Sequence, residues 1–370
     1  MTAASTSPKR YYKRERSLWE LVPTVILLII ALYLIVQAAA SQVAILAVGG
    51  LVLLLLVALL VIREIALRST AEGGIIARIR PFFLARGQED SQFKRLMIHM
   101  ALILACMIAA YPVLRIFSVS LRPGQNLVST DLSIIPEGAT LEHYRDILFG
   151  NAEKRREGDF FLWMWNSAII TATTAMIGVI LAAMAAYAFS RFKFRGRNTG
   201  MIFFLTTQMI PAGMLLLPLF LMLANLKLTN SYLGMVLAYS VTSVPFSIWI
   251  LKGYYDTIPF DLEEAAMIDG TSQLGAFWRI LLPLSTPALA IVFLFNFMAA
   301  WSEYMVANVI IKSEIMRTWP LGLQEFSGSY TTSFGRFAAT SILVAVPVMA
   351  LFLYSSKWLL GGLTLGSVKG

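Results

Sequence analysis

Long apolar stretches dominate the pattern of hydrophobic and polar positions along the chain. Each is close to or above the roughly 20 residues that a helix needs to cross the hydrocarbon core of a membrane. They cover residues 18–39, 43–62, 96–119, 160–189, 199–223, 233–250, 287–311 and 337–360. Inside lipid every backbone N–H and C=O must be bonded within the protein, so stretches of this length are predicted to be helices. The alternating ten-residue segments typical of a membrane β-barrel do not occur in this pattern.

The composition supports this interpretation. Hydrophobic residues make up 58% of the 370 residues and charged residues 14%, with a mean hydropathy of +0.72. A soluble domain carries about 25% charged residues. We therefore expect an all-α integral membrane protein with about eight spans, and a soluble enzyme is excluded.

Lysine and arginine predict the orientation of these spans. With the N-terminus inside, the inner segments hold 20 of the 30 basic residues. Those segments are residues 1–17, 63–95, 190–198, 252–283 and the C-terminal tail. Cytoplasmic loops carry such an excess, so both termini are predicted to be cytoplasmic. The net charge of +9 is thus explained by the membrane topology. The basic residues are scattered over many loops, which does not favour a nucleic-acid-binding surface.

The N-terminal segment allows two interpretations. Basic residues 9–16, the apolar run 18–36 and the alanines at 38–40 together resemble a cleavable signal peptide. The run is longer than is usual for such a peptide and a second apolar stretch follows directly, which favours a retained two-helix hairpin. We accordingly expect three parts. Residues 1–95 form the hairpin and a basic inner loop that lies on the anionic leaflet. Residues 96–159 form the first core span and an outer loop, and residues 160–370 form the rest of the core.

Chemistry based on cysteine or histidine is not indicated. Cys106 is the single cysteine, and His99 and His143 have no second histidine at ligand spacing, so neither a disulfide nor a metal site is expected. His143 lies in a predicted outer surface helix over 140–148 that Thr140 caps, and we expect it to be a surface residue.

The inner segment 254–283 is predicted to form two short helices. Asp261 is the expected cap of the first, with Glu264 completing a capping box, and Gly270 ends it because glycine tolerates positive φ. Ser272 is the expected cap of the second helix, which Pro283 ends. The first helix is acidic, so an anionic leaflet would repel it, and docking onto a protein is favoured over an interfacial helix lying on lipid.

The same segment carries a family resemblance. Glu264–Ala266, Gly270 and Ile280-x-Leu282-Pro283 have the spacing of the EAA loop in permease subunits of ATP-binding-cassette importers. The resemblance implies a six-helix type I importer core, here preceded by the hairpin, and a loop that docks on a separate ATPase. The residues it assigns to this coupling are Glu263, Glu264, Ala265, Ala266, Asp269, Gly270, Ile280, Leu282 and Pro283.

Other segments resemble maltose-type (MalG-type) permeases, so that the likeness covers residues 96–370. They are 120–122, 135–137, 166–167, 186–197 and 362–370. The resemblance implies two ATPase subunits, contacted through the loop and the C-terminal tail, a homologous MalF-like second permease and an extracytoplasmic sugar-binding protein. It implies no cofactor, catalytic residue or metal. The phosphate-binding pattern G-x-x-x-x-G-K-[ST] is missing from the sequence, so the chain itself is not expected to hydrolyse ATP.

Two outer features leave alternatives open. Gly328, Ser329, Tyr330 and Thr331 correspond to a loop that enters the sugar cleft of the binding protein in maltose-type members, but a plain flexible loop fits equally. Glu303 lies roughly 30 Å of helix beyond Pro283, which favours a position at the outer boundary over a buried functional charge.

The sequence also leaves more than one function to compare. An importer permease for maltose or maltodextrin is the expectation, with trehalose or glycerol phosphate as alternative solutes. An ion-coupled secondary transporter would leave the inner loop without a role, and an assembly protein would not need its signature.

Overall fold

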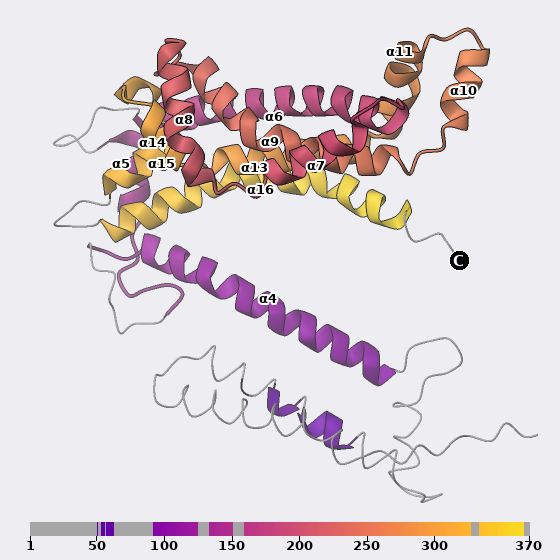
Figure 1. Cartoon of the computed structure of the whole chain (residues 1–370). Coiled ribbons are helices and arrows are strands. Elements are labelled where there is room, and N and C mark those ends of the chain that lie inside the picture. Colours follow the sequence, from indigo (N-terminus) through magenta and orange to yellow (C-terminus); the bar gives the residue numbers. More distant parts are fainter. Residues whose placement is uncertain are drawn as a thin grey trace, which may run out of the picture. The chain divides into compact units, whose positions relative to one another are not determined.

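The computed structural model describes residues 50, 53–55, 57–62, 92–124, 133–150, 159–326 and 333–365. Every regular element within these ranges is helical (Figure 1). The first predicted span, 18–39, lies outside the described residues, and the second is described only in part. The N-terminal hairpin therefore stays a prediction.

The chain divides into two compact units, of which the second carries the functional segments. The first comprises residues 1–115 and 129–134, and the second residues 116–128 and 135–370. Helix α4 (Gln92–Ser120) supplies most of the described part of the first unit.

Three long helices form the centre of the second unit. Helix α6 (Asp159–Arg191) packs along α9 (Tyr232–Tyr255) and α13 (Thr286–Trp301), and α16 (Phe334–Leu365) packs on α13 (Figure 1). The buried face of α6 carries small residues, among them Ala175, Ala182 and Ala186. Small side chains let helix backbones approach closely, and the resulting van der Waals packing favours helix association in membranes.

The predicted span over 199–223 is two helices. Helices α7 (Arg197–Thr207) and α8 (Ala212–Asn225) meet at an angle of 100°. Pro211, the N-cap of α8, explains the break, because proline disfavours helical backbone in the residue before it and lacks an N–H.

The predicted span over 287–311 is also interrupted. Helix α13 ends at Trp301 and α14 (Met305–Ile310) follows. Glu303 lies in the break, and its carboxylate accepts the N–H groups of Val306 at 2.9 Å and Ala307 at 3.1 Å. The carboxylate thereby satisfies two of the free donors at the start of α14.

Four described helices are long and apolar enough to cross a membrane, and two further pairs, each bent at a break, bring the number to six when each pair counts as one span. Six is the number expected for the core. The second bent pair joins residues Gln273–Leu284 to α13 at 76°.

The end of α4 is tied to the short helix α5 (Glu142–Phe149) within the second unit. The hydroxyls of Ser120 and Tyr144 share a hydrogen bond of 2.7 Å, and His143 Nε2 bonds the Arg122 carbonyl at 2.9 Å. His143 is buried, so the expectation of a surface histidine is wrong: His143 and Ile147 share the inner face of α5. Thr140 does accept the N–H of Glu142, but Leu141 occupies the N-cap position.

Short elements close the opposite end of the bundle from α10 (Figure 1). They are η3 (Glu314–Met316), α15 (Trp319–Leu323) and η4 (Gln324–Phe326). Asn166 of α6 holds them, because its amide donates to the carbonyls of Ile315 at 2.8 Å and Arg317 at 2.9 Å. Its own oxygen accepts the Tyr232 hydroxyl at 2.7 Å, so this buried amide is satisfied on both sides.

Gly322 provides a test of the close approach between α15 and α6. A Cβ at this position would lie 2.1 Å from the indole ring of Trp163. We expect Gly322→Ala to lower the free energy of unfolding by about 1–3 kcal/mol, the usual cost of overpacking. The matched control is Gly253→Ala in α9, where a Cβ meets nothing within 4 Å and alanine stabilises helix by about 0.5–1 kcal/mol. Thermal unfolding in nanodiscs measures both, and equal behaviour of the two variants would contradict the packing.

Candidate functional site: the inner helical loop

The segment 254–283 forms a compact helical projection. It contains α10 (Asp261–Ile268), α11 (Gln273–Ala276) and a single π-helical turn, η2 (Phe277–Leu281), which runs into α12 (Leu282–Leu284). Figure 1 shows α10 and α11 at one end of the bundle, the end that the C-terminal end of α6 also reaches. The two expected helices are thus confirmed.

The first turn of α10 differs from the expectation. The N-cap is Phe260, whose carbonyl accepts the N–H groups of Glu263 at 2.9 Å and Glu264 at 3.1 Å. Asp261 is already helical, so its predicted capping role is wrong. Its charge still lies in the first turn, where the helix dipole favours a carboxylate.

The turn between the helices follows the sequence prediction. Gly270 has φ +87°, a conformation that residues with a Cβ adopt at a cost. Ser272 caps α11, since its hydroxyl accepts the N–H of Gly275 at 3.1 Å. Pro283 does not end the helical run, which continues to Leu284 and changes direction at Ser285.

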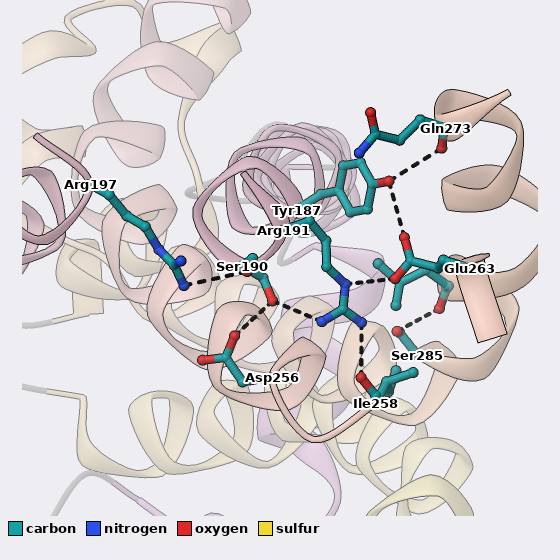
Figure 2. A network of polar contacts seen from close by, with 10 residues as sticks. Tyr187, Ser190, Arg191, Arg197, Asp256, Ile258, Glu263, Gln273 and Ser285 are labelled. Atoms are coloured by element: carbon teal, nitrogen blue, oxygen red, sulfur yellow. Dashed lines mark hydrogen bonds and ion pairs between the residues drawn. The ribbon is translucent and has the colours of Figure 1, made fainter. Parts of the chain in front are cut away.

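The inner face of α10 carries a buried carboxylate. The Glu263 side chain is 1% exposed and accepts a charged hydrogen bond of 2.6 Å from Nε of Arg191, itself 7% exposed, at the end of α6. The hydroxyl of Tyr187, one turn earlier on α6, donates to the second carboxylate oxygen at 3.1 Å (Figure 2). Tyr187 also donates to the Gln273 carbonyl at 3.2 Å, so that one side chain reaches both helices of the loop.

The guanidinium of Arg191 continues the network. It donates to the Ile258 carbonyl at 3.0 Å and to the Ser190 hydroxyl at 3.4 Å (Figure 2). Ser190 in turn donates to Asp256 at 2.7 Å, and Lys252 donates to the other oxygen of that carboxylate at 2.5 Å. Three segments of chain, namely the ends of α6 and α9 and the inner face of α10, are therefore connected through charged hydrogen bonds.

Asp256 gives the network a dependence on pH. Burial alone would raise the pKa of its carboxyl, but hydrogen bonds from Lys252 and Ser190 outweigh burial and lower the pKa below its usual value. The stabilisation from these bonds is present above the usual pKa and is lost as the pH falls through the lowered one.

An apolar cluster lies against the polar contacts. Tyr255, Phe277 and Leu281 are buried together with Tyr187, and the rings of Tyr187 and Phe277 are 4.7 Å apart. Burying such side chains contributes roughly 1.5–3 kcal/mol each. The loop is thus fixed to the bundle by both packing and charge.

The predicted coupling residues divide into two groups. Glu263 and Ala266 are buried on the inner face, and Ile280 and Leu282 are partly buried. The remaining residues are exposed: Glu264, Ala265, Asp269, Gly270 and Pro283. Tyr187 and Arg191 were not among the predicted site residues, although they lie in the segment 186–197 that carried the family resemblance. No local spacing pairs Arg191 with Glu263, because 72 positions separate the two charged residues.

Two further predicted contact segments, residues 328–331 and the tail residues 366–370, lie outside the described residues. Within the described ranges, no group of three or more acidic, histidine or cysteine side chains is arranged to hold a metal ion.

Comparison with known proteins places this fold and loop in a family. Residues 161–361 match the family described as binding-protein-dependent transport system inner membrane component. The chain is 35% identical over 301 residues to the maltose/maltodextrin transport system permease protein MalG of Yersinia pestis, a match that covers 78% of this chain and 98% of the relative. It is 35% identical over 277 residues to the galactooligosaccharides transport system permease protein GanQ of Bacillus subtilis, over 74% and 94%.

A solved structure has the same fold. A chain of a bacterial ABC transporter involved in the import of the acidic polysaccharide alginate superposes with a TM-score of 0.60 at 23% identity, over 74% of this chain and 99% of that one. The matches define a multi-pass inner-membrane permease subunit. The chain belongs to the binding-protein-dependent permease family of ABC importers.

The ion pair behind α10 yields a quantitative prediction. Arg191→Met leaves the Glu263 carboxylate buried without its cation, which should cost about 3–5 kcal/mol. Lys252→Met breaks the more exposed pair with Asp256 and should cost at most about 1 kcal/mol. Denaturant titration in mixed micelles compares the two variants.

The double variant Arg191→Met/Glu263→Gln serves as the control for charge. It removes the uncompensated carboxylate and should recover more than half of the loss. If Arg191→Met costs no more than Lys252→Met, the pair does not hold the loop.

Proposed function

We propose that this chain is one of two permease subunits of an ATP-driven importer that carries an oligosaccharide of the maltodextrin or galactooligosaccharide type. The names of its relatives support that substrate class. A binding protein delivers the sugar outside, a MalF-like permease completes the pathway, and two separate ATPase subunits supply the energy.

The observation that carries this proposal is the contrast between the two faces of α10. Its inner face is held by Arg191 and Tyr187, whereas its outward side exposes Ile268 to 86%. Leu274 of α11, six residues after Ile268 in the sequence, is 67% exposed. Covering one such side chain with a partner contributes roughly 1.5–3 kcal/mol, which supports docking in a groove of an ATPase.

Charge complements the apolar surface. Glu264 and Asp269 are exposed on the same loop and suit a basic partner surface. We assign to Glu264 a contact with an arginine of the ATPase, and to Ala265 and Gly270 the close packing that small residues allow.

The mechanism follows from the fixed attachment. When ATP closes the ATPase pair, the docked loop moves with it as a rigid body. The Glu263–Arg191 pair passes this displacement to α6, and buried Tyr255 passes it to α9. The bundle then changes from inward-facing to outward-facing.

The orientation follows from the same assignment. With α10 on the cytoplasmic side, the C-terminal end of α16 lies at that side too (Figure 1), which supports a cytoplasmic C-terminus and a tail within reach of the ATPase. The N-terminus is assigned to the cytoplasm from the distribution of basic residues. The loop with Tyr330 is assigned to the outer side, where it can contact the binding protein.

Docking is tested by Ile268→Glu. A charge at this position should reduce co-purification of the ATPase at least tenfold without changing the folding of the permease, because the side chain is 86% exposed. Ile315→Glu is the control, since Ile315 is 68% exposed but lies in η3 at the other end of the bundle. Equal retention of the ATPase by both variants would remove the docking surface.

Coupling is tested at Gly270. Gly270→Val forces a β-branched residue into positive φ, at a cost of about 1–2 kcal/mol, and should lower sugar uptake per ATP hydrolysed several-fold in proteoliposomes. Gly270→Asn is the matched control, because asparagine tolerates this backbone conformation. Normal coupling in the valine variant would show that the turn geometry does not matter.

A further inference from the structure

A cavity with a mostly apolar lining and several polar side chains lies between the spans, away from the loop. It has a volume of about 390 Å³, and α6, α9, α13 and the break after α7 supply its walls. Gln208 lies at that break and donates to the Thr242 carbonyl at 3.1 Å. A cavity of this size is in the range of small-ligand sites, and the proposed coupling mechanism makes no use of it.

Apart from the Tyr239 hydroxyl, which lies beside Glu303, three polar groups of the lining have no hydrogen-bond partner among the described residues. They are the hydroxyls of Thr174 and Ser243 and the amide nitrogen of Asn296. Thr174 is fully buried and Asn296 is 2% exposed. A buried polar group without a partner costs about 1–3 kcal/mol, so three of them on one cavity indicate that something else bonds them.

The placement of Asn296 is specific. Its side-chain oxygen accepts the Ser247 hydroxyl at 3.0 Å, which fixes the amide and leaves the NH₂ group without a partner among the described residues. Gly178 of α6 makes room for it, because a Cβ there would lie 2.8 Å from the amide nitrogen. The donor is therefore positioned by two neighbouring helices.

Glu303 supplies acceptors at the cavity wall. Each of its oxygens accepts one backbone N–H of α14, and the Tyr239 hydroxyl lies beside the carboxylate as a further donor. A carboxylate offers about four acceptor positions, so at least one is left for another donor. The described residues of the lining include no lysine or arginine, so an anionic ligand would meet no counter-charge from them. A neutral ligand with many hydroxyl groups fits this set of donors and acceptors.

Aromatic side chains complete the lining. Phe246 and Phe295 are both partly exposed, with ring centroids 6.4 Å apart. Ring faces suit the C–H face of a sugar, whose hydroxyl edge then points to the polar groups. A lining that combines aromatic rings with polar groups suits a pyranose.

We propose that this cavity is a contact site for a neutral oligosaccharide during its passage through this subunit. Thr174, Ser243 and Asn296 donate to sugar oxygens, and Glu303 accepts from sugar hydroxyls. The inference rests on the proposed importer function and adds to it a substrate-contacting site in this chain.

The test uses Thr174→Val and Ser243→Ala in the complete transporter with its binding protein, reconstituted in proteoliposomes. Each variant removes a hydroxyl that has no partner in the described protein, so thermal stability should be unchanged or slightly higher. ATP-dependent uptake of radiolabelled maltotriose should fall about fivefold in each single variant, the effect of losing one hydrogen bond, and further in the double variant.

The matched control is Thr171→Val, one turn earlier on α6. Its hydroxyl donates to the Ser167 carbonyl within the helix and does not line the cavity. Uptake within twofold of the wild type is expected for this variant.

The outcomes separate the two proposals. If Thr174→Val and Ser243→Ala transport like Thr171→Val while the wild type takes up maltotriose, the cavity binds water only and this inference is overturned, although the importer function stands. If the wild-type transporter takes up neither maltotriose nor a galactooligosaccharide with ATP, the importer function fails and the inference fails with it.

Discussion

The burial of one carboxylate, that of Glu263, is the interaction on which the inner end of the molecule depends. Removing a carboxylate and a guanidinium from water costs several kcal/mol each, and their attraction offsets this only with good geometry and further hydrogen bonds. Arg191 and Tyr187 supply both. The pair therefore adds position more than stability: it holds α10 against the end of α6, so that in the proposed mechanism a displacement of the loop becomes a displacement of α6.

Periodicity and turn chemistry predicted much of the fold. The apolar stretches predicted the long helices α6, α9 and α16. Gly270 as a helix end and Ser272 as a helix cap predicted the two helices of the loop. These features depend on neighbours in sequence. The breaks at Pro211 and Glu303 were missed because a hydropathy pattern averages over about 20 residues and does not register a local change of direction.

The candidate site was predicted less completely for the same reason. Glu263 and Glu264 are adjacent and chemically equal, yet one is buried and the other exposed. The ion pair with Arg191 on α6 determines which of the two glutamates is buried, and Arg191 is distant in sequence. His143 shows the same limit, since it is buried through a carbonyl on a segment 21 residues earlier. Sequence reasoning located the loop, whereas tertiary contacts assigned its faces.

Gly270 has one consequence that concerns handedness. No atom lies within 4 Å of a Cβ built on this residue, so space does not restrict the choice of side chain there. Its φ of +87° is unfavourable for L-amino acids because of their chirality, whereas D-amino acids favour positive φ. A D-alanine placed here by chemical ligation would fit the turn without strain, so stereochemistry, and not size, makes glycine the natural occupant.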